Sequence, residues 1–578
     1  SLLEEKLAGP PPKPQEIISS IPDDLNQLCH DLLQPNPADR PSSREVLARL
    51  EGRGVSVVEV PVWIGRESEL RILETAWADV SQGGTRVVLV SGLSGLGKTA
   101  LVDHFLANLR HRTSVVVLRG RCYENESVAY RGFDGVIDSL ATYLSRLPTS
   151  EVERVLPMQV EPLCQLFPVL GEIAAIASHL TTGPASQADP REQRLRGIAA
   201  LREMLCRLAR YVPLVLFIDD LQLGDDGTAT IFCDIFKRDE SPRALMLATY
   251  RSESAECNDC LHRIRRSQAT LAQQNSMCDQ TEVTIDKLTD AESLRLAGSL
   301  LRRHLIDDPH EARRIADEAE GDPLFIRMLV EYQARKAMAP AREPAQPTQR
   351  SRWTLSTVIK DRIESLETDE RAAVELLAAA GRPVDAHDVE SVAARGDTSV
   401  GLVRSLRIKR LIRRLGDRER IEIFHDKIRE TLLTMIPSKR VARYCLSLAK
   451  QLDGHERAIT GEEGRRSDKD IDFLADLYRR GGNRKRAGEC YELAAERAAS
   501  TFAFSRAIEC YRYAIEFLQP QGKHEQRLRR GYADALANAS RSSEAAQQYT
   551  QDAAVAEASD ARQLLQLAAR RYVTSGHV

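Results

Sequence analysis

Residues 86–103 (RVVLVSGLSGLGKTALVD) constrain the fold most, because they place a glycine-rich turn between a strand pattern and a helix pattern. The turn has the P-loop spacing Gly92-x-x-x-x-Gly97-Lys98-Thr99. Glycines let backbone N–H groups surround a phosphate, and the N-terminus of the following helix adds partial positive charge. Lys98, also a catalytic candidate, would reach the β- and γ-phosphates, and the Thr99 hydroxyl would ligate Mg²⁺. The candidate residues for binding ATP or ADP in this loop are Gly92, Gly95, Gly97, Lys98, Thr99 and Ala100.

A second strand pattern, residues 214–220, ends in two carboxylates. The apolar run before Asp219 and Asp220 is typical of a central parallel strand covered on both faces. Carboxylates at the C-terminal end of such a strand face the crevice where α/β sheets bind ligands. This is the Walker B pattern: Asp219 would hold Mg²⁺, directly or through water, and Asp220 would polarise the attacking water. A solvated aspartate pair at an ordinary strand end is the alternative, and the upstream P-loop argues against it.

The bulk composition narrows the classes of function. A chain of 578 residues predicts roughly three to five domains. A net charge of −3 argues against a chain that binds polyanions as a whole, and the low aromatic content of 5% leans towards helix. We find no apolar run of about 18–20 residues and no signal-peptide pattern, so we expect a cytoplasmic protein without membrane contact.

The eleven cysteines are scattered through helix and strand patterns. Most of them are typical of small buried hydrophobic residues in a reducing cytosol. Cys257 and Cys260, with His262 and Cys278 nearby, suggest a metal site as an alternative. Because no second pair has zinc-ribbon spacing, we favour the structural role.

Several sequence boxes, in order, resemble the AAA+-like ATPases called STAND proteins (signal-transduction ATPases with numerous domains). The resemblance covers residues 62 to about 435. Leu223 and Gly224 depart from it, because the family usually has tryptophan and alanine at these positions. The boxes are residues 63–71 (WIGRESELR), the P-loop, residues 219–225 (DDLQLGD), residues 249–251 (TYR), residues 321–323 (GDP) and residues 424–430 (FHDKIRE).

This resemblance implies roles for residues outside the P-loop. Gly65 and Arg66 would lie beside the adenine, and Pro323 would pack near the adenine at the start of a lid helix. Arg251 would approach the γ-phosphate as a catalytic residue, with an ordinary surface arginine as the alternative. In some relatives a histidine at the position of His425 contacts the β-phosphate of ADP and locks a closed state. A histidine hydrogen-bonded within its own domain is the alternative for His425.

The N-terminal residues 1–52 resemble the last helices of a protein kinase C-lobe, on the motif LQPNPADRPS at residues 33–42. In that family an arginine at the position of Arg40 pairs with a buried glutamate near the activation segment. The glycine-rich loop specific to kinases, the H-R-D motif and the D-F-G motif are not found in this sequence. Residues 1–52 therefore lack the groups that kinase catalysis requires. We expect an N-terminally truncated fragment of a bacterial kinase–ATPase–repeat protein, with an unrelated helical hairpin as the alternative.

The C-terminal half reads as helices, with a β-hairpin pattern over residues 411–424 that suggests a winged-helix domain. A run of six basic residues in this domain could bind DNA phosphates, but a solvent-exposed face is the favoured interpretation. The six are Arg404, Arg407, Lys409, Arg410, Arg413 and Arg414. Further on, an Ala-x-x-x-Tyr spacing recurs and resembles degenerate tetratricopeptide repeats, whose concave surface would bind partners. The three copies are Ala487 and Tyr491, Ala507 and Tyr511, and Ala545 and Tyr549.

We therefore expect an α/β P-loop NTPase with a parallel sheet, then a winged-helix domain and an all-α TPR-like solenoid. The expected boundaries are a kinase-like remnant (1–52), a linker (53–62), the ATPase core (63–285), a helical lid (286–336), a linker (337–350), the winged-helix-like domain (351–440) and the repeats (441–578). We expect a signalling switch that binds and slowly hydrolyses ATP. Its partners would be a serine/threonine kinase domain in cis, a protein or small-molecule inducer on the repeats, and further copies of itself in the ATP state. A STAND-type transcription regulator is the alternative, although we find no terminal helix-turn-helix pattern, and nucleic acid is not an expected partner.

Overall fold

The structure is a computed structural model that describes residues 15, 23–33, 41, 63–123, 130–180, 189–237, 240–272, 279–338, 354–393, 401–415, 419–460, 471–554 and 558–574. The chain divides into two compact units, Ser1–Trp63 and Ile64–Val578. In the first unit the structure describes helix α3 (Asp23–Leu32), in which Leu28 is buried. Arg40 and most of the kinase-like motif lie outside the described residues, so the kinase remnant stays a prediction.

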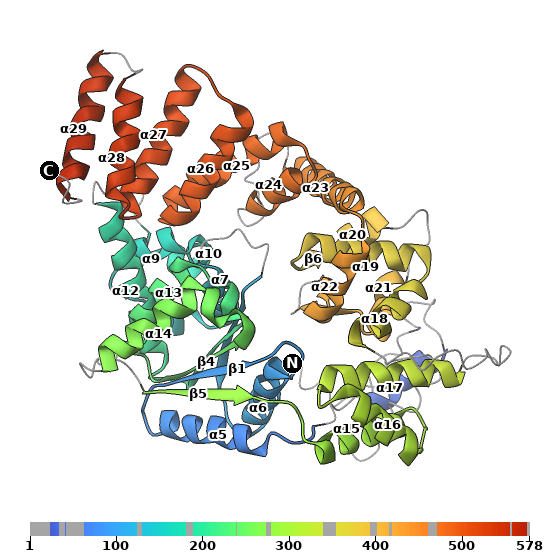
Figure 1. The fold of residues 1–578 in the computed structure, drawn as a ribbon. Coiled ribbons are helices and arrows are strands. Elements are labelled where there is room, and N and C mark those ends of the chain that lie inside the picture. The colour runs from blue at the N-terminus through green and yellow to red at the C-terminus, as the bar shows by residue number, and fades with distance from the viewer. Residues whose placement is uncertain are drawn as a thin grey trace. The chain divides into compact units, whose positions relative to one another are not determined.

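A five-stranded parallel sheet forms the core of the second unit (Figure 1). Its strand order is β2-β3-β4-β1-β5. Strands β1 and β3 confirm the two strand patterns described above, whereas β5 was not predicted. Only Val283 and Ile285 of β5 are buried, because β5 is an edge strand, and its sequence DQTEVTI lacks an apolar run. The strands are β1 (Arg86–Gly92), β2 (Val116–Arg121), β3 (Leu214–Asp219), β4 (Ala244–Arg251) and β5 (Asp279–Ile285).

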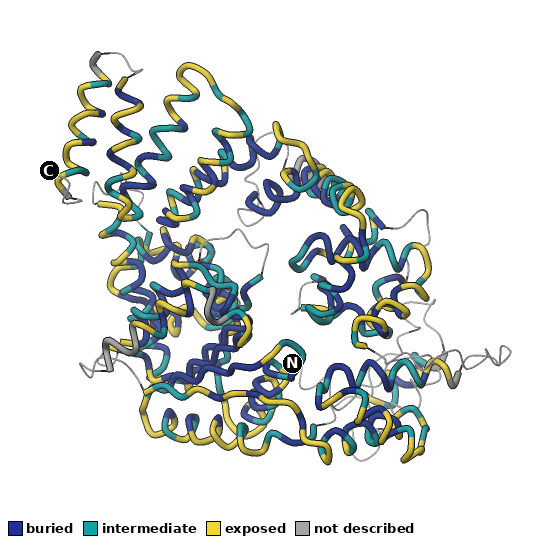
Figure 2. Tube along the Cα trace, viewed as in Figure 1, coloured by how far each residue is buried: buried dark blue, intermediate teal, exposed yellow. Residues whose placement is uncertain are grey.

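The central strands are fully enclosed by helices, and Figure 2 shows this region as buried. The apolar residues 87–90 and 214–218 are all 0% exposed, as expected for parallel strands covered on both faces. Helix α5 packs on β1, β4 and β5, whereas α7 packs on β2 and β3. The helices around the sheet are α5 (Glu67–Ser81), α6 (Lys98–Arg112), α7 (Arg131–Leu144), α8 (Thr149–Val155), α9 (Val160–Leu166), α10 (Pro168–Gly171), α11 (Ala174–Ala177), α12 (Pro190–Leu208), α13 (Asp226–Ile235) and α14 (Asp259–Ala272), with 3-10 turns η2 (Leu221–Leu223) and η3 (Ser252–Cys257).

Three helices follow β5: α15 (Asp290–Arg303), α16 (Pro309–Ala319) and α17 (Pro323–Met338). A capping box starts α15, in which Thr289 and Glu292 satisfy each other's backbone N–H groups. Helix α17 continues through residues 337 and 338, which the sequence analysis assigned to the linker. The other residues of that linker, 339–350, lie outside the described part of the chain.

Residues 354–436, which we call the hairpin segment, combine helices with a three-stranded antiparallel sheet of order β6-β8-β7. The hairpin predicted over residues 411–424 is confirmed, because β7 pairs with β8. Assignment of this segment to the winged-helix class stays a prediction. Its elements are α18 (Leu355–Glu364), α19 (Thr368–Ala380), β6 (Val384–Asp385), α20 (Ala386–Ala393), α21 (Leu402–Ile408), β7 (Ile412–Leu415), β8 (Arg420–Ile423) and α22 (Asp426–Met435).

The remaining helices each pack against the next one along the chain. Tyr491, Tyr511 and Tyr549 are buried, and the alanine before each is fully enclosed, so the small–large spacing does serve close packing. Helix α23 runs across the predicted boundary between the winged-helix-like domain, which ends at residue 440, and the repeats, which start at residue 441. No helix in the described ranges is long and apolar enough to cross a membrane. The helices are α23 (Ser438–Thr460), α24 (Ile471–Arg480), α25 (Arg484–Ser500), α26 (Phe504–Leu518), α27 (Lys523–Asn538), α28 (Ser542–Ala553) and α29 (Ala558–Thr574).

Candidate nucleotide site

The glycine-rich turn joins β1 to α6 and has the backbone of a phosphate-binding loop. Gly92, Gly95 and Gly97 have positive φ values of 149°, 97° and 94°. A Cβ atom on Gly92 would lie 2.6 Å from the carbonyl oxygen of Ile285, so only glycine fits there. Helix α6 begins directly after Gly97, and Ala100 lies in its first turn, so the N-terminus of α6 opens towards the loop.

Lys98 is the first residue of α6, and its side chain reaches back to the loop. Its Nζ atom donates to the carbonyl oxygens of Gly92 and Leu93, at 2.8 Å each. Burial lowers the pKa of Lys98, and the nearby carboxylate of Asp220 opposes that shift. The N–H group of Ser94 in the same loop donates to Oε1 of Glu253, at 3.3 Å. Polar groups of the loop are therefore already aimed at carboxylate and carbonyl oxygens, the kind of atom that a phosphate would present.

Asp219 and Thr99 form an oxygen-only donor set at the end of β3. The Thr99 hydroxyl donates to Oδ1 of Asp219 at 2.9 Å, and the Thr249 hydroxyl donates to the same oxygen. Asp219 is 1% exposed. Hydroxyl and carboxylate oxygens are the protein ligands that Mg²⁺ prefers, so the residues fit this ion. Thr99 and Asp219 would hold Mg²⁺, which when bound neutralises charge on phosphate oxygens.

Asp220 is held firmly beside Asp219. Its backbone has φ 58°, and its N–H group donates to the Thr249 hydroxyl at 3.1 Å. The amide of Gln222 donates to Oδ1 of Asp220 at 2.9 Å and accepts at its own oxygen from the Arg251 N–H group at 3.0 Å. Burial, followed by the charge of Asp219, raises the pKa of Asp220, and Arg121 acts in the opposite direction. A carboxyl group with a raised pKa in a crevice is a candidate general base.

The Gly65-Arg66 box lies between the P-loop and the start of the lid helices. The Arg66 guanidinium donates to the carbonyl oxygen of Asp286, and more weakly to that of Leu96 at 3.5 Å. Gly65 has φ 74°, and a Cβ atom there would lie 2.2 Å from Oε1 of Glu292. The structure therefore places Arg66 against Leu96 of the loop, and the position of Gly65 and Arg66 beside the adenine stays a prediction.

Pro323 is the first residue of α17, which also starts near the loop. Asp322 caps this helix by accepting from the N–H groups of Leu324 and Phe325, at 2.9 and 3.1 Å. A Cβ atom on Gly95 would lie 3.4 Å from the carboxylate of Asp322. The start of α17 thus lies against the P-loop, and the packing of Pro323 near the adenine stays a prediction.

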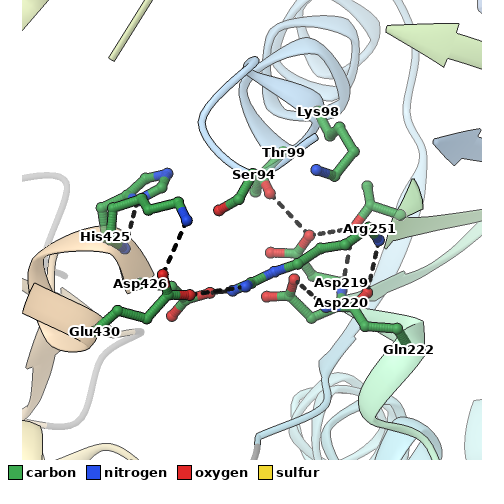
Figure 3. Close-up of polar contacts among 12 residues, drawn as sticks. Ser94, Lys98, Thr99, Asp219, Asp220, Gln222, Arg251, His425, Asp426 and Glu430 are labelled. Carbon is green, nitrogen blue, oxygen red and sulfur yellow. Dashed lines mark hydrogen bonds and ion pairs between the residues drawn. The ribbon is translucent and has the colours of Figure 1, made fainter. Parts of the chain in front are cut away.

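Arg251 reaches from the end of β4 to α22 of the hairpin segment (Figure 3). Its guanidinium pairs with Asp426 and, at 3.0 Å, with Oε1 of Glu430. Lys427 holds the other oxygen of Glu430 at 2.9 Å. The charge of Arg251 is therefore engaged by carboxylates of a different segment, and its predicted approach to the γ-phosphate stays a prediction.

His425 precedes α22 and serves as its N-cap. Its Nδ1 atom accepts from the N–H group of Lys427 at 3.1 Å, so the ring is hydrogen-bonded within its own segment. Burial lowers the pKa of His425 to about 4, and the charge of Asp426 only partly opposes that shift. The ring is therefore neutral at physiological pH. Its proposed contact with a β-phosphate stays a prediction.

Arg121 is a site residue that the sequence analysis did not single out. It ends β2 and contacts both Asp220 (NH2 to Oδ2, 3.0 Å) and Glu422 of β8 (NH1 to Oε1, 2.9 Å). Burial alone would lower the pKa of Arg121, but Glu422, Asp219 and the neighbouring carboxylates raise it well above the usual value. A signal was present in the sequence, since Arg121 follows the apolar run of residues 115–118, which is typical of a strand. A cavity of about 240 Å³ adjoins this cluster and is lined by residues that include Arg121, Asp220, Gln222, Arg251, Glu422 and Asp426.

The basic run of the hairpin segment is largely engaged within the chain. Lys409 pairs with Glu370 at 2.5 Å, and Arg413 pairs with Glu422 at 2.6 Å. Arg410 also pairs with a carboxylate, Glu331, at 3.3 Å. These pairs reduce the charge available for nucleic acid phosphates.

The described residues contain no group of three or more His, Cys, Asp and Glu side chains arranged to hold a metal ion. The Cys257 side chain and all of Cys278 lie outside the described part of the chain, so the alternative zinc site is not tested by the structure.

Comparison with known proteins finds a family model that matches part of the chain. A family model described as "AAA ATPase domain" matches residues 62–247. The chain therefore contains an AAA-type ATPase domain. It is also 28% identical over 171 residues to "Hybrid signal transduction histidine kinase G" of Dictyostelium discoideum. That match covers 28% of this chain and only 5% of the relative.

Two solved structures are also similar to the chain. A signal transduction ATPase with numerous domains that has a tetratricopeptide repeat sensor, from Pyrococcus horikoshii, is 14% identical with a TM-score of 0.42. The match covers 90% of this chain and 75% of that one. A Walker-type ATPase of Pyrococcus abyssi is 16% identical with a TM-score of 0.31, and the match covers 64% of this chain and 96% of that one.

Proposed function

We propose that this protein is a switch that binds ATP and hydrolyses it slowly to ADP and phosphate. Arg251 carries the proposal, because it lies beside the Walker B aspartates while Asp426 and Glu430 of the hairpin segment hold its guanidinium. In the reaction, a water oxygen attacks the γ-phosphorus and Asp220 accepts the water proton. The bond from the γ-phosphorus to the bridging oxygen breaks, and ADP leaves with that oxygen.

The switch follows from a competition for Arg251. The γ-phosphate of ATP and the carboxylates of α22 are both anions that a guanidinium binds through charge-assisted hydrogen bonds. ADP lacks the γ-phosphate, so with ADP bound Arg251 stays with Asp426 and Glu430 and the hairpin segment remains docked. With ATP bound, Arg251 turns to the γ-phosphate and the hairpin segment is released. Differential affinity of the two arrangements for the two nucleotides is what such a switch requires.

The C-terminal helices are the proposed sensor. They contact the ATPase domain at Tyr130, whose hydroxyl donates to the carbonyl oxygen of Phe502 at 3.2 Å. The N–H group of Tyr130 in turn donates to Asp225 at 3.1 Å, and Asp225 caps α13 shortly after the Walker B strand. A protein or small-molecule inducer that moves the 501–502 turn would therefore act on the residues next to Asp220.

We further propose that the released, ATP-bound form associates with other copies, and that the output is a serine/threonine kinase joined to the N-terminal residues in the cytoplasm. The resemblance of residues 33–42 to a kinase C-lobe motif supports the kinase link. The alternative of a transcription regulator has less support, because Lys409, Arg410 and Arg413 of the basic run pair with carboxylates of the chain.

Equilibrium binding of fluorescent ATP and ADP, with and without Mg²⁺, tests the nucleotide part of this proposal. Wild type should bind both nucleotides, and Lys98→Ala should lose at least about 10-fold in affinity, since one buried charge-assisted contact is removed. Arg484→Ala is the matched control, because Arg484 is 64% exposed on α25. Equal affinities for wild type and Lys98→Ala would contradict the proposal.

A further inference from the structure

Three aromatic rings form a cluster on helices α25 and α26, which pack against each other (Figure 1). The ring centroids of Tyr491 and Tyr513 lie 5.0 Å apart, and those of Tyr513 and Phe517 lie 5.7 Å apart. Tyr491 is buried, whereas Tyr513 and Phe517 are half-buried and reach the surface. The cluster therefore forms a fixed apolar support at the surface of the C-terminal helices.

Three arginines from three neighbouring helices lie over these rings. Arg479 of α24 and Arg512 of α26 lie over Tyr513, with 5.6 and 5.2 Å between the guanidinium carbon and the ring centroid. Arg484 of α25 lies over Phe517 at 5.1 Å. Such a contact holds a guanidinium in place without neutralising its charge, because the ring carries no net charge. We call Arg479, Arg484 and Arg512 the arginine strip.

The arginine strip carries more positive charge than the neighbouring carboxylates balance. Asp476 pairs with Arg479 and also lies 3.6 Å from Arg480, so one buried carboxylate is shared by two arginines. Arg512 is exposed, and no carboxylate among the described residues pairs with it. The strip therefore has a charge that an anionic partner would complement.

We propose that the arginine strip binds an acidic segment of a partner protein. Carboxylates match guanidinium groups both in charge and in the geometry of paired hydrogen bonds. The ion pair of Arg484 with Glu516 is exposed and worth about 0.2–1 kcal/mol, so an incoming carboxylate can replace Glu516. Because the strip crosses three helices, a segment with several Asp or Glu residues can contact it at more than one point. This inference rests on the proposed sensor role of the C-terminal helices and names the chemistry of its partner.

Nucleic acid fits the same surface less well. Single strands bind largely through bases that stack on aromatic side chains. Here the guanidinium groups of Arg479 and Arg512 lie over Tyr513, Arg484 lies over Phe517, and the rings also pack on one another. The strip therefore presents N–H donors rather than a ring on which a base could stack.

The test measures binding of two fluorescent peptides, eight glutamates and eight glutamines, to the full-length protein by anisotropy. Wild type should bind the glutamate peptide at least about 10-fold more tightly, since several ion pairs add up. Arg484→Gln and Arg512→Gln should each weaken that binding about 3- to 10-fold, and the double variant should weaken it further. Arg541→Gln is the matched control, because Arg541 is 49% exposed on the neighbouring surface of α28 and pairs with Glu544. It should bind the peptide as wild type does.

Equal affinity of wild type for the two peptides would overturn the inference. A folded double variant that bound the glutamate peptide as tightly as wild type would also overturn it, because the binding would then lie elsewhere. The same holds for an RNA of eight uridines that bound more tightly than the glutamate peptide and lost affinity in the same variants, since the strip would then be a nucleic-acid site. Binding of fluorescent ATP to the same samples tests the proposed function separately, because the peptide measurements need no nucleotide.

Discussion

The ion pairs between Arg251 and α22 should control how fast ADP leaves. We expect Asp426→Asn and Glu430→Gln to accelerate ADP release, because each weakens the attachment of the hairpin segment beside the nucleotide site. The side chains of Arg251, Asp426 and Glu430 are 20%, 31% and 44% exposed, so the two pairs differ in solvent screening. The more enclosed Asp426 should matter more than Glu430.

The expected magnitudes follow from this exposure. A partly enclosed charge-assisted hydrogen bond contributes about 1–2 kcal/mol, so Asp426→Asn should speed release about 5- to 30-fold. The more exposed Glu430 contributes about 0.3–1 kcal/mol, so Glu430→Gln should speed release about 2- to 5-fold. The double variant should release ADP faster than either single variant.

Release of a fluorescent ADP analogue, chased with excess unlabelled nucleotide in stopped flow, measures these rates. Glu419→Gln is the control and should release ADP at the wild-type rate. The ion pair that Glu419 makes with Arg414 is long (3.9 Å), and the Glu419 side chain is exposed. Raising the salt concentration should accelerate release in wild type more than in the double variant. If the double variant released ADP at the wild-type rate, the two carboxylates would not hold the hairpin segment in place through Arg251, and the reasoning would be refuted.

Three further perturbations test other parts of the structure. Gly65→Ala places a Cβ atom at positive φ and 2.2 Å from Oε1 of Glu292, which also caps α15. In denaturant titrations this change should lower the free energy of unfolding by about 2–3 kcal/mol. The control Gly482→Ala, at positive φ but with open space around it, should lower it by about 1 kcal/mol. Because the pKa of His425 is lowered to about 4 from an unfolded value of about 6.5, its contribution to stability is intact above pH 6.5 and declines as the pH falls towards 4; His425→Asn, which keeps an N-cap acceptor, should remove this part of the pH dependence of thermal unfolding. Tyr130→Phe should weaken docking of the 501–502 turn by about 1 kcal/mol and raise its hydrogen exchange about 5-fold, whereas Tyr143→Phe should not; equal exchange in the two variants would argue against the Tyr130 contact.

The sequence predicts much of the ATPase fold because its central strands are continuous apolar runs. Residues 87–90 and 214–218 are buried on both faces, and this leaves no polar positions to obscure the pattern. The edge strand β5 escapes prediction for the opposite reason, since one side of it needs no apolar cover. The P-loop and the Walker B aspartates are equally easy to predict from the sequence, because their function depends on residues adjacent in the chain.

The contacts between the ATPase domain and the hairpin segment cannot be predicted from the sequence. Arg121 and Glu422 are 301 positions apart, and Arg251 and Asp426 are 175 apart. With 81 Lys and Arg and 84 Asp and Glu in the chain, charge alone offers too many possible partners. The pairs are selected by tertiary structure, which sets the ends of β2 and β4 opposite β8 and α22. Arg251 was recognised from its motif, but its partners required the structure.

Nucleotide content and turnover of the purified full-length protein provide the first measurement to make on the switch. Wild type should carry ADP or bind it with Mg²⁺, and should hydrolyse ATP slowly. Asp220→Asn should retain nucleotide binding and lose at least about 100-fold in turnover, because the amide cannot accept the water proton. Wild-type turnover in Asp220→Asn, or a wild-type protein that binds no adenine nucleotide in the presence of Mg²⁺, would contradict the ATPase switch.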